Sequence, residues 1–142
     1  MINSRDINAL YPEVKEKALE LIELCKKQHI DIIITSTFRD TESQNYLYQQ
    51  GRTRKGKIVT HAKGGQSFHN YRVAFDVVPV RFGKAVWNDM TLWKKIGAIG
   101  ISIGLEWAGN WKTFKEYPHF QYTKGLKLAD FQAGKAHGVF YV

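Results

Sequence analysis

The chain has 142 residues, and its 21 Lys and Arg against 13 Asp and Glu give a formal net charge of +8. This length suits one domain that buries roughly 68% of its unfolded surface, while the single cysteine, Cys25, excludes an intramolecular disulfide and a cysteine-rich metal site. No apolar run approaches the roughly 18 residues of a membrane span, and the positive charge favours contact with polyanions such as nucleic acid, anionic lipid and acidic wall polymers.

The N-terminal part of the chain predicts a helix followed by a strand. Apolar residues at helical spacing, with Pro12 at a first helical position, predict an amphipathic helix over residues 12–29. Cys25 lies on its apolar stripe, where a free thiol usually behaves as a small buried hydrophobe. The β-branched run 31–38 predicts a buried strand, so Arg39 is expected at the end of a strand.

A second helix and a long irregular segment follow. A capping-box pattern at residues 41–44 and a stop at Gly51 predict a helix over about residues 41–50. Residues 51–66 are rich in Gly and Lys and show no periodicity. A loop of this length inside a small domain is more often functional than idle.

The next strand candidate, residues 73–80, carries a charge within an apolar run. Alternation places Ala74, Asp76 and Val78 on one face of this strand. Burying a carboxylate without a partner is costly, so Asp76 should pair with a cation or bind a metal. A structural ion pair and a metal site both remain open at this point.

The rest of the chain predicts one longer helix, two short strands and a short final helix. They cover residues 89–103 (after a cap at Asn88 or Asp89), 105–108, 118–122 and 126–132. Because helices and strands mix without strict alternation, the pattern favours an α+β fold over a doubly wound parallel sheet. We expect a single domain over residues 1–142, with no separate cell-wall-binding domain.

Two histidines and a carboxylate form a candidate metal site. His69 precedes the strand that carries Asp76, and His119 lies in a later strand candidate. Two imidazoles and one carboxylate are a ligand set typical of catalytic zinc, and Glu116 could take a proton from water. Because Pro118 excludes a helix here, Glu116 and His119 meet only if the chain bends between them. Zinc hydrolysis, a structural metal or ion-pair network, and unrelated residues all remain open.

The order S-x-H-x-x-x-x-A-x-D, from Ser67 to Asp76, followed by E-x-x-H ending at His119, resembles a family of peptidoglycan peptidases. This family includes D-alanyl-D-alanine carboxypeptidases and the L-alanyl-D-glutamate endopeptidases of phage endolysins and bacilli. The segment 36–39 together with Gln44 also resembles the stretch that these enzymes place before the metal motif. The resemblance covers roughly residues 30–125 and is greater to the endolysin branch.

The resemblance implies a role for each matching residue. It makes His69, Asp76 and His119 the ligands of one Zn²⁺ per chain and Glu116 the catalytic base. It also places Arg39 beside the polarised substrate carbonyl, and Ser67 and Gln44 near bound peptide. The implied fold is a small, mostly antiparallel sheet with helices packed against it, like that of hedgehog and D-Ala-D-Ala peptidases. The chain departs from the family at Arg72, where Gly is usual, and at Tyr117, where Trp is frequent.

The implied function is that of a cell-wall-lytic endolysin that hydrolyses the L-alanyl-D-glutamate bond of peptidoglycan stem peptides. Two alternatives remain, a D-alanyl-D-alanine carboxypeptidase or dipeptidase of the same fold and a non-catalytic wall-binding module with a structural zinc. We expect a monomer with no nucleic-acid or membrane partner, and acidic wall polymers as a further partner. The polar segment 1–6 lacks a signal peptide's apolar core, so we expect cytoplasmic synthesis and access to the wall after lysis or a membrane lesion.

Overall fold

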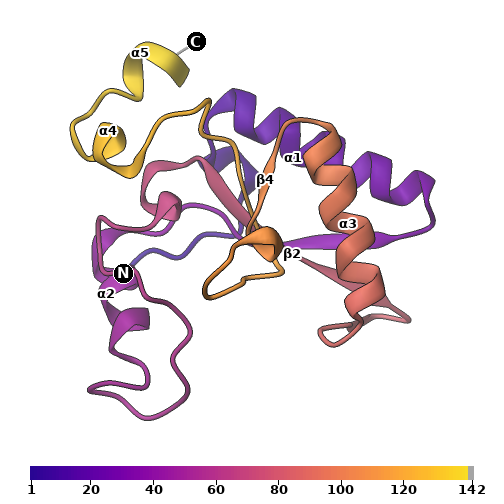
Figure 1. Ribbon diagram of the computed structural model, residues 1–142, viewed down its shortest axis with the longest axis horizontal. Coiled ribbons are helices and arrows are strands. Elements are labelled where there is room, and N and C mark those ends of the chain that lie inside the picture. Colours follow the sequence, from indigo (N-terminus) through magenta and orange to yellow (C-terminus); the bar gives the residue numbers. More distant parts are fainter. Residues whose placement is uncertain (141–142) are drawn as a thin grey trace.

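A five-stranded antiparallel sheet lies at the centre of the computed structural model, which describes residues 1–140 (Figure 1). The strands are β1 (Asp31–Ser36), β2 (Ala74–Arg81), β3 (Lys84–Ala85), β4 (Glu106–Trp107) and β5 (His119–Gln121). Their order is β1-β2-β5-β4, and β3 forms a hairpin with β2. The expected α+β fold with a small antiparallel sheet is confirmed.

Five helices accompany the sheet within the described residues. They are α1 (Pro12–Lys27), α2 (Thr41–Gln49), α3 (Met90–Ser102), α4 (Leu128–Gln132) and α5 (His137–Phe140). The first four are close to the helices expected from the sequence. The cap of α2 differs, because the side chain of Asp40, one residue before the expected capping box, accepts a hydrogen bond from the Ser43 amide at 2.8 Å. None of the helices in residues 1–140 has the length and apolar character needed to cross a bilayer.

Two short elements are absent from the sequence prediction. The β2–β3 hairpin turns at Phe82 and Gly83, which both have positive φ. A phenylalanine at the first of these positions is an unusual turn residue, so the chain lacks the Asn-Gly or Asp-Gly signal of such hairpins. Helix α5 has only four residues and gives too little periodicity to detect.

The core lies between one face of the sheet and the helices α1 and α3, which also contact each other (Figure 1). Phe75, Trp107 and Phe120 project from three neighbouring strands into this core. Cys25 of α1 is completely buried, and burial raises the pKa of its thiol to about 11. The apolar face of the sheet is therefore closed, and the alternate residues of the same strands point to the other face.

Helix α3 comes close to the sheet because it presents glycine at Gly97 and Gly100. A methyl group added at Gly97 would overlap the ring of Trp107, and one added at Gly100 would overlap Phe120. The Trp107 indole donates a 2.8 Å hydrogen bond to the Tyr117 carbonyl, so this packing also supports the turn before β5.

We expect Gly97→Ala to destabilise the fold by about 1–2 kcal/mol. Overpacking a core usually costs about 1–3 kcal/mol, and the better helix propensity of alanine returns at most about 1. Urea unfolding monitored by tryptophan fluorescence will measure the change. Exposed Ala98 on the same helix provides the control, because Ala98→Gly should cost about 1 kcal/mol through helix propensity alone. A Gly97→Ala variant as stable as the wild type would contradict the close packing.

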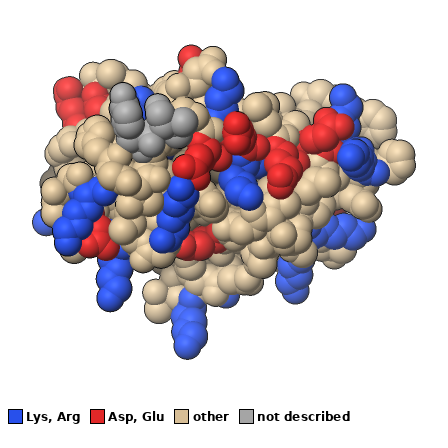
Figure 2. Space-filling view, turned by 90° about the horizontal axis from the view of Figure 1, so that it is seen from above, with Lys and Arg blue, Asp and Glu red and all other residues tan. Residues whose placement is uncertain are grey.

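Charge is unevenly distributed over the molecule. The face in Figure 2 carries acidic and basic side chains next to one another, whereas residues 43–75 contain basic side chains and no Asp or Glu.

Two arginines of this basic stretch stabilise the irregular segment after α2. Arg52 and Arg54 donate hydrogen bonds of 2.6 Å to the carbonyls of Tyr48 and Tyr46, and each guanidinium stacks on the ring of the same tyrosine.

Candidate metal centre and active site

The sheet register brings Asp76 and His119 together. Asp76 of β2 lies directly opposite His119 of β5, and Ser36 of β1 lies opposite Asp76 on its other side. Directly opposed residues on antiparallel strands share a face with their Cβ atoms about 4.5–5.5 Å apart. The three side chains therefore form a row across the face of the sheet that faces away from the core.

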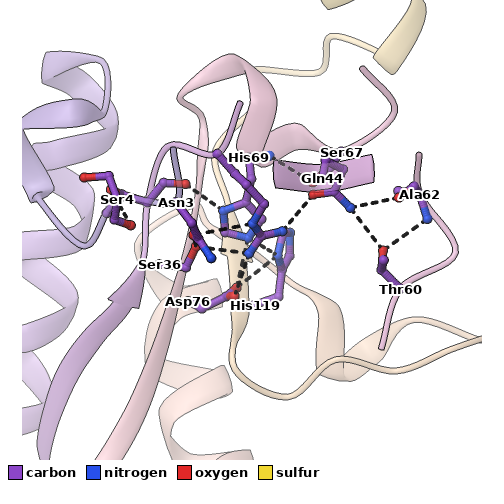
Figure 3. A network of polar contacts seen from close by, with 12 residues as sticks. Asn3, Ser4, Ser36, Gln44, Thr60, Ala62, Ser67, His69, Asp76 and His119 are labelled. Atoms are coloured by element: carbon purple, nitrogen blue, oxygen red, sulfur yellow. Dashed lines mark hydrogen bonds and ion pairs between the residues drawn. The ribbon is translucent and has the colours of Figure 1, made fainter. Parts of the chain in front are cut away.

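His69 reaches this row from a 3₁₀ helix over Phe68–Tyr71, before β2. The Ser67 hydroxyl accepts a hydrogen bond from the His69 amide at 3.2 Å and caps this helix. The Nδ1 atom of His69 lies 2.8 Å from the carbonyl oxygen of Thr37, which can only accept a hydrogen bond, so Nδ1 carries the proton. The Nε2 lone pair then points at Asp76 and His119 (Figure 3).

The cluster has the composition and geometry of a metal site. One ligand atom from each of His69, Asp76 and His119 lies within 4.8 Å of the other two. Burial lowers the pKa of His69, which favours the neutral imidazole that metals bind. Burial alone would raise the pKa of Asp76, but the two adjacent imidazoles outweigh it and hold this pKa well below its usual range. Two imidazole nitrogens and one carboxylate suit zinc, and they leave its fourth position to a non-protein ligand.

Arg39 stands beside this cluster and is only 8% exposed. Its guanidinium donates hydrogen bonds to the side chains of Gln44 at 2.8 Å and Ser36 at 3.0 Å, and it lies 3.8 Å from the Asp76 carboxylate. These contacts hold a fixed positive charge at the edge of the cleft.

Gln44 is completely buried, which differs from the expected contact with bound peptide. Its oxygen accepts the hydrogen bond from Arg39, and its amide nitrogen donates to the Ala62 carbonyl at 2.8 Å. The side chain therefore connects Arg39 to the irregular segment after α2, and its position favours support of Arg39 over contact with the substrate. The sequence did not predict this burial, because Gln44 is a polar residue in a mostly polar helix.

Glu116 reaches the cleft because the chain turns between it and His119. The His119 amide donates a 3.2 Å hydrogen bond to the Glu116 carbonyl, which closes a turn through Tyr117 and Pro118. The bend required by the sequence is thus confirmed. Burial raises the pKa of the Glu116 carboxylate, and no hydrogen bond or ion pair within residues 1–140 engages that carboxylate. A carboxylate without a partner beside a metal site is suited to proton transfer.

Arg39, Ser67 and Glu116 line one cleft with the three candidate ligands, and its volume is about 950 Å³. The irregular segment after α2 also lines this cleft, and its His61 ring packs edge-on against Phe114 at 4.2 Å between centroids. Volumes of this order accommodate a small-molecule or peptide ligand.

Comparisons with known proteins show the family to which the chain belongs. Residues 60–122 match a family described as D-alanyl-D-alanine carboxypeptidase. The chain is 40% identical over 121 residues to the peptidoglycan L-alanyl-D-glutamate endopeptidase CwlK of Bacillus subtilis, covering 79% of this chain and 72% of the relative. The chain belongs to this family of peptidoglycan peptidases. The family membership expected from the motifs is confirmed.

A phage relative and a solved structure extend the comparison. The L-alanyl-D-glutamate peptidase of a Listeria phage is 29% identical over 133 residues, which cover 91% of this chain and 44% of that enzyme. The D,D-pentapeptidase VanY of a VanB-type resistance cassette, solved in complex with Zn(II), is 12% identical with a TM-score of 0.65 over 94% of this chain and 84% of that one. The fold is therefore that of the peptidoglycan peptidases, as expected.

Arg72 is the position at which the sequence resemblance leads us to expect glycine, and its backbone conformation suits that residue. Arg72 has φ 64°, in the left-handed region that glycine adopts without strain. Its guanidinium points away from the cleft, donates a 2.8 Å hydrogen bond to the Ala9 carbonyl and stacks over the Phe38 ring. Arg72 therefore leaves the substrate cleft open. It also connects the N-terminal segment, at Ala9, to the start of β2.

Proposed function

We propose that the protein is a zinc-dependent endopeptidase that hydrolyses the amide bond between L-alanine and D-glutamate in peptidoglycan stem peptides. The observation that carries this proposal is the unpartnered carboxylate of Glu116 in the same cleft as the cluster of His69, Asp76 and His119. The 40% identity to the Bacillus subtilis endopeptidase supports the choice of bond.

We assign one zinc ion per chain to the three clustered side chains. Zinc, when bound, supplies a Lewis acid that polarises a carbonyl and makes water more acidic. The Glu116 carboxylate takes the proton of the attacking water and then gives it to the departing D-glutamate amine. Its raised pKa brings the carboxyl closer to the operating pH, which suits a group that must both accept and donate the proton.

Arg39 and Ser67 both act on the substrate in this cleft. The Arg39 guanidinium is held in place before the substrate binds, so it can stabilise negative charge on the carbonyl oxygen without reorganising. The Ser67 hydroxyl accepts a hydrogen bond from the His69 amide, which leaves its own O–H to donate a hydrogen bond to a peptide carbonyl. Gln44 contributes by holding Arg39.

Mass spectrometry of the products from purified stem peptides tests the bond assignment. We expect a new L-alanine carboxyl terminus and a new D-glutamate amine. Release of D-alanine would instead assign the chain to the carboxypeptidases, the activity named by the family that matches residues 60–122. Zinc binding without any product would favour a wall-binding module.

A further inference from the structure

A chain of hydrogen bonds runs from the candidate metal site through His119 to the molecular surface. The Nε2 atom of His119 lies 2.8 Å from the Gln121 side-chain oxygen. The Gln121 amide nitrogen donates to one oxygen of the Glu106 carboxylate at 2.7 Å, and the Thr123 hydroxyl donates to the other at 2.7 Å. His119 and Gln121 share a face of β5, and Gln121 lies opposite Glu106 of β4.

The direction of every bond in this chain follows from Glu106. A carboxylate can only accept hydrogen bonds, so the Gln121 nitrogen must face it and the Gln121 oxygen must face His119. That oxygen can only accept, so His119 carries its proton on Nε2. Nδ1 is then the nitrogen left to bind a metal, and it lies 3.2 Å from both Asp76 and the His69 ring nitrogen.

We propose that Gln121 and Glu106 are positioning residues that fix His119 as an Nδ1 ligand of the metal. The inference rests on the zinc site of the proposed function. Groups that accept the remaining N–H of a metal-bound histidine fix its tautomer and ring orientation, and their loss typically weakens metal binding about 10- to 100-fold. Here a buried amide stands between the histidine and the carboxylate, so an exposed side chain determines the tautomer of a buried ligand.

The partners of Glu106 favour this role over that of an ordinary surface charge. Its two oxygens accept hydrogen bonds from Gln121 and Thr123, which are 4% and 3% exposed. No ion pair within residues 1–140 engages Glu106, although the protein carries a large excess of cations. The carboxylate is thus directed toward buried neutral donors.

Glu106→Gln is the deciding variant because it keeps the size of the side chain but replaces a group that can only accept hydrogen bonds, which is what sets the direction of the bonds. A glutamine at this position can donate as well as accept, so the Gln121 amide can turn over and present its nitrogen to His119. Such a turn requires an unprotonated Nε2 and places the proton on Nδ1, where it blocks metal binding. We expect zinc affinity, measured by competition with a chromophoric chelator, to fall by about 10-fold.

Gln121→Leu removes the whole connection and should lower zinc affinity by about 10- to 100-fold. Long-range proton–nitrogen correlation spectra of the metal-free proteins provide a readout independent of activity. In the wild type Nε2 of His119 should carry a proton, whereas Glu106→Gln should show an added population in which Nε2 carries none. Exposed Glu20 gives a matched control, because Glu20→Gln makes the same charge change far from the chain of bonds.

The outcomes separate this inference from the proposed function. A wild-type protein that binds no zinc would remove the metal on which both depend. Zinc binding by the wild type, together with unchanged affinity and unchanged His119 tautomer in Glu106→Gln, would overturn the positioning role alone. Glu106 is exposed, so Glu106→Gln is expected to fold. It therefore tests the positioning role even if Gln121→Leu does not fold.

Discussion

Glu116→Gln will lower kcat for stem-peptide hydrolysis by about 10²- to 10⁴-fold, the usual contribution of a general acid–base residue. The reason is that glutamine keeps the size of the side chain but can neither take the proton of water nor return it to the amine. Zinc content should stay at the wild-type value, because Glu116 lies outside the cluster of candidate ligands. KM should change little if the group acts mainly in the transition state.

Steady-state kinetics and zinc analysis on the same preparations measure both parts of this result. Glu20→Gln, an exposed substitution of the same kind on α1, should retain wild-type kcat and zinc content. A Glu116→Gln protein that is folded but free of zinc would make Glu116 a ligand. Wild-type turnover in that variant would remove it from the mechanism.

Asp76→Asn is expected to remove both zinc binding and turnover. Asparagine provides a neutral oxygen where zinc sites use a carboxylate. The substitution also takes away the anion that lies 3.1 and 3.2 Å from the two imidazole nitrogens and 3.8 Å from Arg39. This loss leaves the buried Arg39 guanidinium without its ion-pair partner, so the metal-free variant should also unfold more easily than metal-free wild type.

Thermal unfolding with and without a chelator tests this prediction. Zinc that binds only the folded state raises Tm, so the chelator should lower the Tm of the wild type and leave that of Asp76→Asn unchanged. Exposed Asp31 at the start of β1 provides the control, because Asp31→Asn should behave like the wild type with and without chelator. A chelator-sensitive Tm in Asp76→Asn would show that the metal is held without this carboxylate.

Local patterns predicted much of the fold. The helices α1, α2 and α3 were visible in apolar spacing and caps, and β2 in its apolar run, because these signals depend on neighbouring residues. The β2–β3 hairpin and α5 were missed, since one uses an unusual turn residue and the other is very short. Strand β1 ends at Ser36 rather than continuing to residue 38.

The residue types of the site were also visible in the sequence. The spacing from His69 to Asp76 and the E-x-x-H group indicated metal chemistry, and Pro118 required the turn that the structure contains. These features are local in the chain. Their roles as ligands and base remain predictions that the experiments above address.

The sequence by itself therefore determined the candidate side chains, the helices and the need for a bend before His119. Only the tertiary structure decided that Asp76 lies opposite His119, that Gln44 is buried behind Arg39, and that Glu106 accepts a hydrogen bond from Gln121. Strand register and order depend on packing between segments far apart in the chain, such as α3 against β4 and β5. Alternation within one strand gives the face on which a residue lies, but not its partner on the neighbouring strand.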